Sequence, residues 1–76
     1  MNKVPVRTAS PALRELFEIM ERKKVTQAAL AKRAYTNPNR IYEYKVGNNI
    51  PGIMAVEEMG MALGYKIKWV PINDPS

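Results

Sequence analysis

The chain contains no cysteine and no histidine. Without cysteine it can form no disulfide, and without either residue it lacks the usual ligands of a structural zinc site. It also has no Gly-rich phosphate loop and no pair of acids placed for acid–base work. We therefore expect no metal and no cofactor, and we expect the protein not to be an enzyme.

Long apolar runs are also missing. No stretch approaches the roughly 18 apolar residues that a membrane-spanning helix needs. The first ten residues include Lys3 and Arg7 but lack the apolar core of a secretory signal. The lack of cysteine agrees with a reducing compartment. These absences predict a cytoplasmic protein with no membrane partner.

The length and the charge of the chain further limit the classes of protein to which it could belong. Its 76 residues are enough for a single domain, 1–76. A domain of this size buries only about 60% of the surface of its unfolded chain, so helix packing or self-association must stabilise it. Lys and Arg number 12 against 7 Asp and Glu, which gives a net charge of +5. This balance favours a polyanionic partner such as nucleic acid.

Apolar residues recur with helical spacing in four segments, expected at 11–24, 26–34, 38–46 and 53–63. Ser10, Thr26 and Asn37 stand at the starts of three of them as N-caps, and Gly47 and Gly64 follow two of them as stops. The residues expected to face the core are Leu13, Leu16, Phe17 and Met20, then Ile41 and Tyr44, then Ile53, Val56, Met59, Gly60 and Leu63.

The two ends of the chain differ from this helical pattern. Residues 1–9 resemble a flexible basic arm, and residues 71–76 resemble a tail. Between the last expected helix and the tail, residues 65–70 alternate apolar and basic side chains. This alternation predicts a short β-strand with one apolar and one cationic face. The expected fold class is therefore mainly α, with four helices and a short C-terminal β-strand.

The two short helices expected at 26–34 and 38–46 are separated by a few residues only, as in a helix-turn-helix. The segment 26–34 (TQAALAKRA), followed by Ile41, Gly47, Pro51 and Leu63-Gly64, resembles the Cro/CI repressor family, also called the xenobiotic-response-element family. The resemblance covers residues 11–64. It implies a lambda-repressor-like helix-turn-helix fold and a sequence-specific DNA-binding regulator of transcription, of the repressor type.

The sequence departs from the family at three positions. Tyr35 stands where the family usually has Gly, Lys45 stands where an acidic residue is frequent, and Pro38 stands where relatives often have a base-contacting polar side chain. A left-handed backbone at Tyr35 would cost something like 1 kcal/mol. The departures concern the turn and the register of base contacts, and they leave the expected fold unchanged.

Two groups of residues are expected to contact double-stranded DNA. The resemblance implies base contacts at the start of the second helix of the motif, at Asn39, Arg40, Tyr42 and Glu43. Asn can pair with adenine, Arg with guanine, and Glu can accept from cytosine. Phosphate contacts are expected from Thr26, Gln27, Asn48 and Asn49. The alternative is that these residues are ordinary solvated side chains and a plain helix cap.

A lone strand at 65–70 cannot satisfy its own backbone groups. The sequence shows no second strand, so we expect the same strand of a second copy to pair with it in a homodimer. The interface residues expected are Met54, Met61, Tyr65, Ile67 and Trp69. The alternative is that the apolar side chains of this segment fold back on the core of the same chain.

Two rival functions share this fold, because fold does not determine function. One is a protein-interaction module, either an antitoxin that binds a toxin or a phage-type protein that binds a host factor. The other is an architectural protein that binds DNA without preference for any sequence. An interaction module without DNA function would show no salt-dependent DNA binding, and an architectural protein would show no preferred operator.

Overall fold

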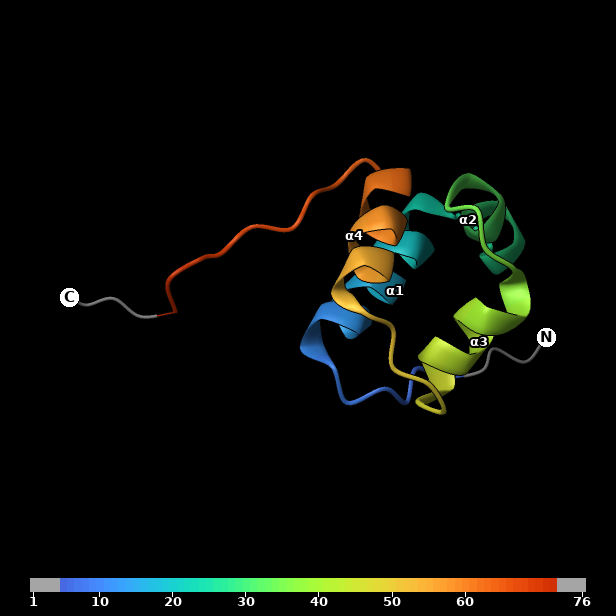
Figure 1. The fold of residues 1–76 in the computed structure, drawn as a ribbon, viewed down its shortest axis with the longest axis horizontal. Coiled ribbons are helices and arrows are strands. Elements are labelled where there is room, and N and C mark those ends of the chain that lie inside the picture. The colour runs from blue at the N-terminus through green and yellow to red at the C-terminus, as the bar shows by residue number, and fades with distance from the viewer. Residues whose placement is uncertain (1–4, 73–76) are drawn as a thin grey trace.

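The computed structural model describes residues 5–72. In this range the chain forms four helices, which are α1 (Pro11–Lys23), α2 (Gln27–Arg33), α3 (Pro38–Val46) and α4 (Ile53–Ala62). Helix α2 contacts both α3 and α4, and α1 contacts α3, so the helices form one body (Figure 1). Helices α2 and α3 follow each other across a four-residue connection. The predicted mainly α helix-turn-helix domain is confirmed.

The helix starts follow from the capping residues. The side chains of Ser10, Thr26 and Asn37 each accept a hydrogen bond from the N–H three residues further on, at 3.3, 3.1 and 2.9 Å. These bonds satisfy N–H groups that have no partner within the helix. Helix α1 ends one residue earlier than expected, because Lys24 adopts a left-handed backbone with φ 57°. The three predicted N-caps are confirmed.

The core lies between the four helices and contains nearly all the residues that the periodicity predicts. The four stripe residues of α1 are buried, as are Ile41 and Tyr44 of α3, and Met59, Gly60 and Leu63 at the end of α4. The expectation is wrong for Ile53, whose side chain is 63% exposed. Ile53 is the first residue of α4 and follows the loop 48–52, whose residues are themselves exposed or half-buried, so no element covers it.

The turn between α2 and α3 keeps its left-handed residue although that residue is a tyrosine. Tyr35 has φ 57°, and its side chain is 96% exposed. The Thr36 N–H donates to the Ala31 carbonyl at 2.9 Å, which closes the end of α2 in the manner of a Schellman motif. The turn therefore has the geometry that favours Gly, and Tyr35 adopts it without packing its ring.

Replacing Tyr35 with Gly should stabilise the fold. The left-handed backbone costs a non-glycine residue about 1–2 kcal/mol, and the greater freedom of Gly in the unfolded chain offsets about 0.5–1 kcal/mol of the gain. We expect a net gain on the order of 0.5 kcal/mol, or roughly 2–4 °C in Tm, measured by thermal unfolding. Tyr35→Ala keeps the backbone cost and serves as the control. Equal stability of Tyr35→Gly and Tyr35→Ala would contradict this explanation.

The segment before α1 is docked on α3. The N–H groups of Arg7 and Thr8 both donate to the Lys45 carbonyl, at 2.8 and 3.1 Å, and Thr8 is only 5% exposed. The Thr8 carbonyl accepts a bond from Arg14 Nε at 3.0 Å. The last carbonyls of a helix lack partners within it, and this segment supplies donors for one of them. The expectation of a flexible arm over 1–9 is therefore wrong for residues 6–8, while residues 1–4 lie outside the described range.

The segment after α4 forms no strand in the single chain. Residues 65–72 lie outside any helix or strand, and Figure 1 shows them leading away from the helical body. A strand needs a neighbouring ladder, and residues 5–72 contain no other strand to provide one. The strand expected at 65–70 is thus absent here. Of the tail expected at 71–76, residues 73–76 lie outside the described range.

None of the helices in residues 5–72 has the length and apolar character needed to cross a membrane.

Candidate nucleic-acid interface

Helix α3 presents a polar face to the surface because its opposite face is fixed in the core. Ile41 is fully buried and Tyr44 is 7% exposed, and their spacing places both on one side of the helix. The other sides carry the four residues predicted to contact bases. Of these, Asn39, Arg40 and Tyr42 are exposed and Glu43 is half-buried. The two core residues therefore determine which side chains α3 offers to a partner.

Two shallow depressions flank this face and connect it to neighbouring elements. The first joins α3 to the start of α2 and is lined by Gln27, Asn37, Pro38, Asn39 and Tyr42. The second joins α3 to the following loop, and its lining includes Asn39, Arg40, Glu43, Asn49 and Pro51. Asn39 lines both. The fold thus brings together Gln27, Asn49 and all four predicted base-contacting residues around one helix.

The loop after α3 is tied to the helix through its backbone. Gly47 adopts φ 87°, and the N–H groups of Asn48 and Asn49 both donate to the Glu43 carbonyl, at 3.0 and 3.3 Å. The side chains of both asparagines are exposed. This arrangement holds two amide side chains at the end of α3, where they could reach the phosphate backbone of a nucleic acid that runs past the helix.

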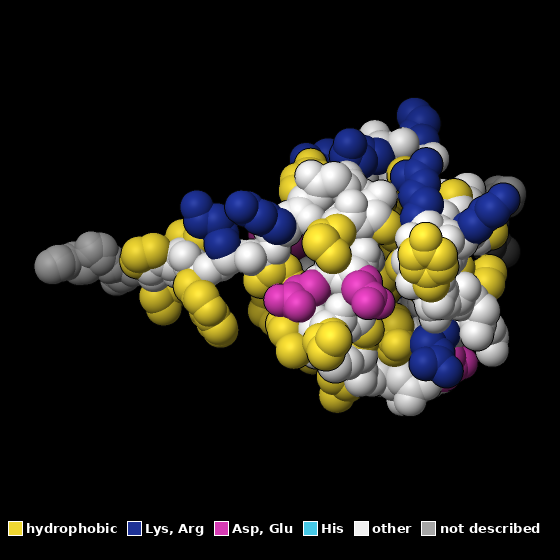
Figure 2. Space-filling model, turned by 45° about the horizontal axis from the view of Figure 1, so that its top comes forward, with side chains coloured by type: hydrophobic (Ala, Val, Ile, Leu, Met, Phe, Trp, Pro, Cys, Tyr) yellow, Lys and Arg dark blue, Asp and Glu magenta, His cyan; other side chains and the backbone are white. Residues whose placement is uncertain are grey.

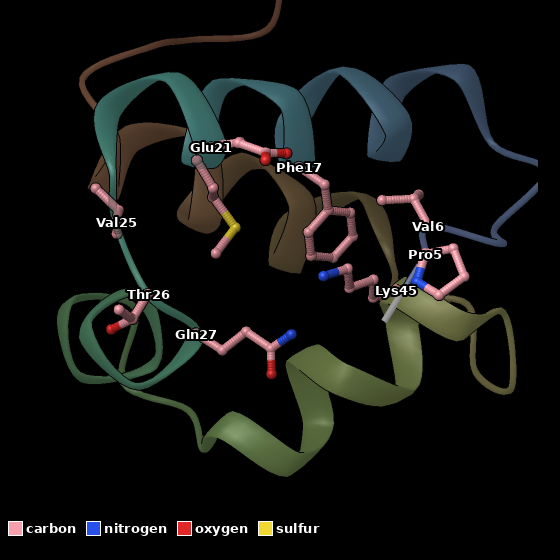
Figure 3. A pocket seen from close by; sticks show the side chains of 9 residues that line it. Pro5, Val6, Phe17, Glu21, Val25, Thr26, Gln27 and Lys45 are labelled. Atoms are coloured by element: carbon pink, nitrogen blue, oxygen red, sulfur yellow. The ribbon is translucent and has the colours of Figure 1, made fainter. Parts of the chain in front are cut away.

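Thr26 lies apart from these two depressions. It lines a third one between α1, the start of α2 and the end of α3, together with Phe17, Met20, Glu21, Val25 and Lys45. Its hydroxyl oxygen accepts from the Ala29 N–H, so its capping role is certain from the geometry. Figure 3 shows Gln27 and Lys45 extending into this space from different helices. Gln27 therefore connects the third depression with the first.

Lys45 is the residue near this surface that sequence reasoning left out of the site. It is half-buried, and its carbonyl holds the segment with Arg7. No local signal marked it, because a residue two positions beyond Glu43 points to a different side of the helix, and its place in the depression with Gln27 depends on how the helices pack. Arg7, Arg40 and Lys45 are the basic residues at these contacts of α3, and the acidic residues are Glu43 and, beside Lys45, Glu21.

Comparison with known proteins finds one distant similarity. No family model matches the chain, and no solved structure matches it. Over 55 aligned residues the chain is 34% identical to multiprotein-bridging factor 1 of Candida albicans. The alignment covers 72% of this chain and 36% of that protein. The chain thus spans about a third of the length of this relative.

Proposed function

We propose that the protein is a sequence-specific DNA-binding regulator of transcription, of the repressor type, which binds a palindromic operator as a homodimer. The observation that carries the proposal is the exposed polar face of α3, held in place by buried Ile41 and Tyr44. A DNA major groove is about 12 Å wide and admits one helix with its side chains. We further propose a binding function without a catalytic step or cofactor.

The side chains on this face have the chemistry for base recognition. Asn39 can form two hydrogen bonds with adenine, Arg40 can do the same with guanine, and Glu43 can accept from cytosine. Tyr42 is 37% exposed, and its ring can contact a thymine methyl group or a phosphate. Asn39 and the capping residue Asn37 line both depressions beside α3, so Asn39 is the predicted base-contacting residue that borders both.

Phosphate contacts would come from the elements on either side of α3. Gln27 and Thr26 stand at the start of α2, and Asn48 and Asn49 stand in the loop after α3. Lys45 adds a cation close to Gln27. Such contacts fix the position of a protein on DNA and carry little sequence information, so they complement the base contacts of α3.

The distant relative supports a regulator that also contacts other proteins. Its name describes a factor that bridges several proteins. The exposed apolar side chains after α4, among them Ile67 and Trp69, offer a surface for such a contact. The second candidate function is therefore an antitoxin or phage-type interaction module on the same fold, in which a protein partner rather than DNA is the principal ligand.

A gel-retardation assay with the DNA directly upstream of the protein's own gene tests the proposal, since small repressors commonly regulate themselves. We expect the wild-type protein to retard this fragment in preference to a shuffled fragment of equal length. Retardation of both fragments at the same concentration would favour an architectural protein. Retardation of neither fragment, with failure to enrich any sequence from random DNA, would favour the interaction module.

Truncation after Tyr65 should convert the homodimer into a monomer. The cut preserves the Tyr65 N–H, which donates to the Gly60 carbonyl at 2.9 Å and closes α4. It removes the exposed side chains of Ile67 and Trp69. Sedimentation at micromolar concentration should show twice the 8.6 kDa mass for the full chain, and for the truncated chain the mass of one shortened chain.

The matched control for the truncation ends after Ile72 and keeps the whole described segment. It should sediment like the full chain. A full chain that sediments as a monomer at the same concentration would contradict the homodimer.

A further inference from the structure

Exposed large hydrophobic side chains are concentrated in the last third of the described chain. Helix α1 has none, and α2 and α3 with the turn between them have only Tyr35 and Tyr42. The remaining ones belong to α4, the loop before it and the segment after it, at Ile50, Ile53, Met54, Met61, Tyr65, Ile67, Trp69, Val70 and Ile72. Exposed apolar surface that is concentrated in one part of a small protein indicates an interaction site.

The outer face of α4 combines apolar and acidic side chains. Met54, Glu57, Glu58 and Met61 are all exposed, and their spacing of three and four residues places them on one side of the helix. Figure 2 shows the acidic pair next to each other with apolar side chains on either side. Helix α4 contains no Lys or Arg. We call these four residues the α4 face.

The segment after α4 has the opposite charge. Lys66 and Lys68 alternate with Tyr65, Ile67 and Trp69. Figure 2 shows basic side chains along one side of the projecting segment and apolar side chains along the other. Trp69 is 98% exposed. We call residues 65–72 the C-terminal segment, whose basic side is complementary in charge to the acidic pair of the α4 face.

The geometry of the helix end directs the C-terminal segment away from the α4 face of its own chain. Gly64 has φ 88°, and the Tyr65 N–H bonds to the Gly60 carbonyl. The Tyr65 ring lies under Lys23 Nζ of α1, 5.9 Å from the ring centroid. The segment therefore starts on the side of α1, and Figure 1 shows it projecting from the body.

The reach of the segment suits a second molecule. Residues 66–72 in extended form span about 23 Å, at roughly 3.3 Å per residue. The ten residues of α4 are about 15 Å long. A projecting segment is thus long enough to cover the α4 face of a neighbouring copy from end to end.

We propose that the C-terminal segment docks on the α4 face of a second copy with its basic side toward that face, so that Lys66 and Lys68 lie beside the acidic pair of that copy. Two-fold symmetry makes the exchange reciprocal, so the contact forms twice. The inference deepens the proposed homodimer and rests on that part of the proposed function, but it does not depend on DNA binding.

Charge-reversal variants test the docking by sedimentation equilibrium. Glu57→Lys with Glu58→Lys, and separately Lys66→Glu with Lys68→Glu, should each weaken the homodimer by about tenfold or more, because attraction becomes repulsion at both copies of the contact. An equimolar mixture of the two variants should form a heterodimer of wild-type strength, since each segment again meets a face of opposite charge. The charge-matched control is Glu15→Lys with Glu18→Lys on the exposed side of α1, which should dimerise like wild type.

Every altered position is exposed, and circular dichroism verifies that each variant keeps its helices. If the Glu57 and Glu58 variant dimerises like wild type while truncation after Tyr65 gives a monomer, the segments pair with each other and the docking is overturned. A mixture that stays monomeric would overturn the exchange as well. A wild-type protein that forms the homodimer but does not bind DNA would contradict only the proposed DNA function and would leave the docking intact.

Discussion

Raising the salt concentration from about 50 to about 200 mM should weaken DNA binding on the order of 10³-fold. Each chain offers three cations around α3, namely Arg7, Arg40 and Lys45, and a homodimer offers them twice. Release of about six counterions gives a slope near −5 for the logarithm of affinity against the logarithm of salt concentration, at roughly −0.9 per charge. Fluorescence anisotropy titrations on the preferred site at several salt concentrations measure this slope.

Two single substitutions make the salt experiment specific to α3. Lys45→Ala should reduce the slope by about two for the homodimer, one counterion for each chain. Lys32→Ala removes a cation from an exposed position of α2 that lines none of the three depressions described, and it should leave the slope unchanged. A flat salt response of the wild-type protein would contradict a phosphate-contacting interface.

Asn39→Ala and Arg40→Ala should each cost about 1–3 kcal/mol in binding to the preferred operator, which is roughly a 5- to 150-fold loss of affinity. Each substitution removes a side chain that can form two hydrogen bonds with one base. Asn39 is uncharged, so its loss should leave binding to unrelated DNA nearly unchanged. Competition titrations with operator and unrelated fragments measure both quantities.

The control for these two variants is Glu15→Ala, which changes an exposed residue of α1. Asn39 and Arg40 are also exposed, and the capping bond at the start of α3 uses the backbone N–H of Arg40, so thermal melts should show both variants folded. Wild-type affinity of both variants for the operator would mean that α3 contacts DNA in another register.

Most of the fold was predictable because helices leave local signals in the sequence. The stripe from Leu13 to Met20 and the pair Ile41 and Tyr44 repeat with helical period, and caps such as Thr26 mark where helices begin. The failures are features that depend on distant partners. The segment before α1 docks because the Lys45 carbonyl accepts from the N–H groups of Arg7 and Thr8, and so short a segment has no period to reveal this.

The structure of the C-terminal segment also depends on a partner that the local sequence does not reveal. Its alternation of apolar and basic residues correctly describes a chain with two different sides, but a strand also needs a ladder partner. The described part of one chain provides no such partner, and the segment extends without forming one. Periodicity predicts the faces of an element, whereas its hydrogen bonding depends on what lies beside it.

The candidate site was predictable to the extent that it follows from helix faces. Once Ile41 and Tyr44 are assigned to the core, the exposure of Asn39 and Arg40 follows from the helical period. The grouping with Gln27 follows from the short connection between α2 and α3. The place of Lys45 beside Gln27 did not follow, because it depends on how closely the two helices pack.

The affinities of the protein for an enriched and a shuffled DNA site show whether α3 distinguishes DNA sequences. A site is first enriched from random DNA with the wild-type protein, and its affinity is then compared with that of a shuffled site at about 150 mM salt, the physiological range. We expect a preference on the order of 10³-fold for the enriched site, which Arg40→Ala reduces. Equal affinity for the enriched and the shuffled site would contradict it.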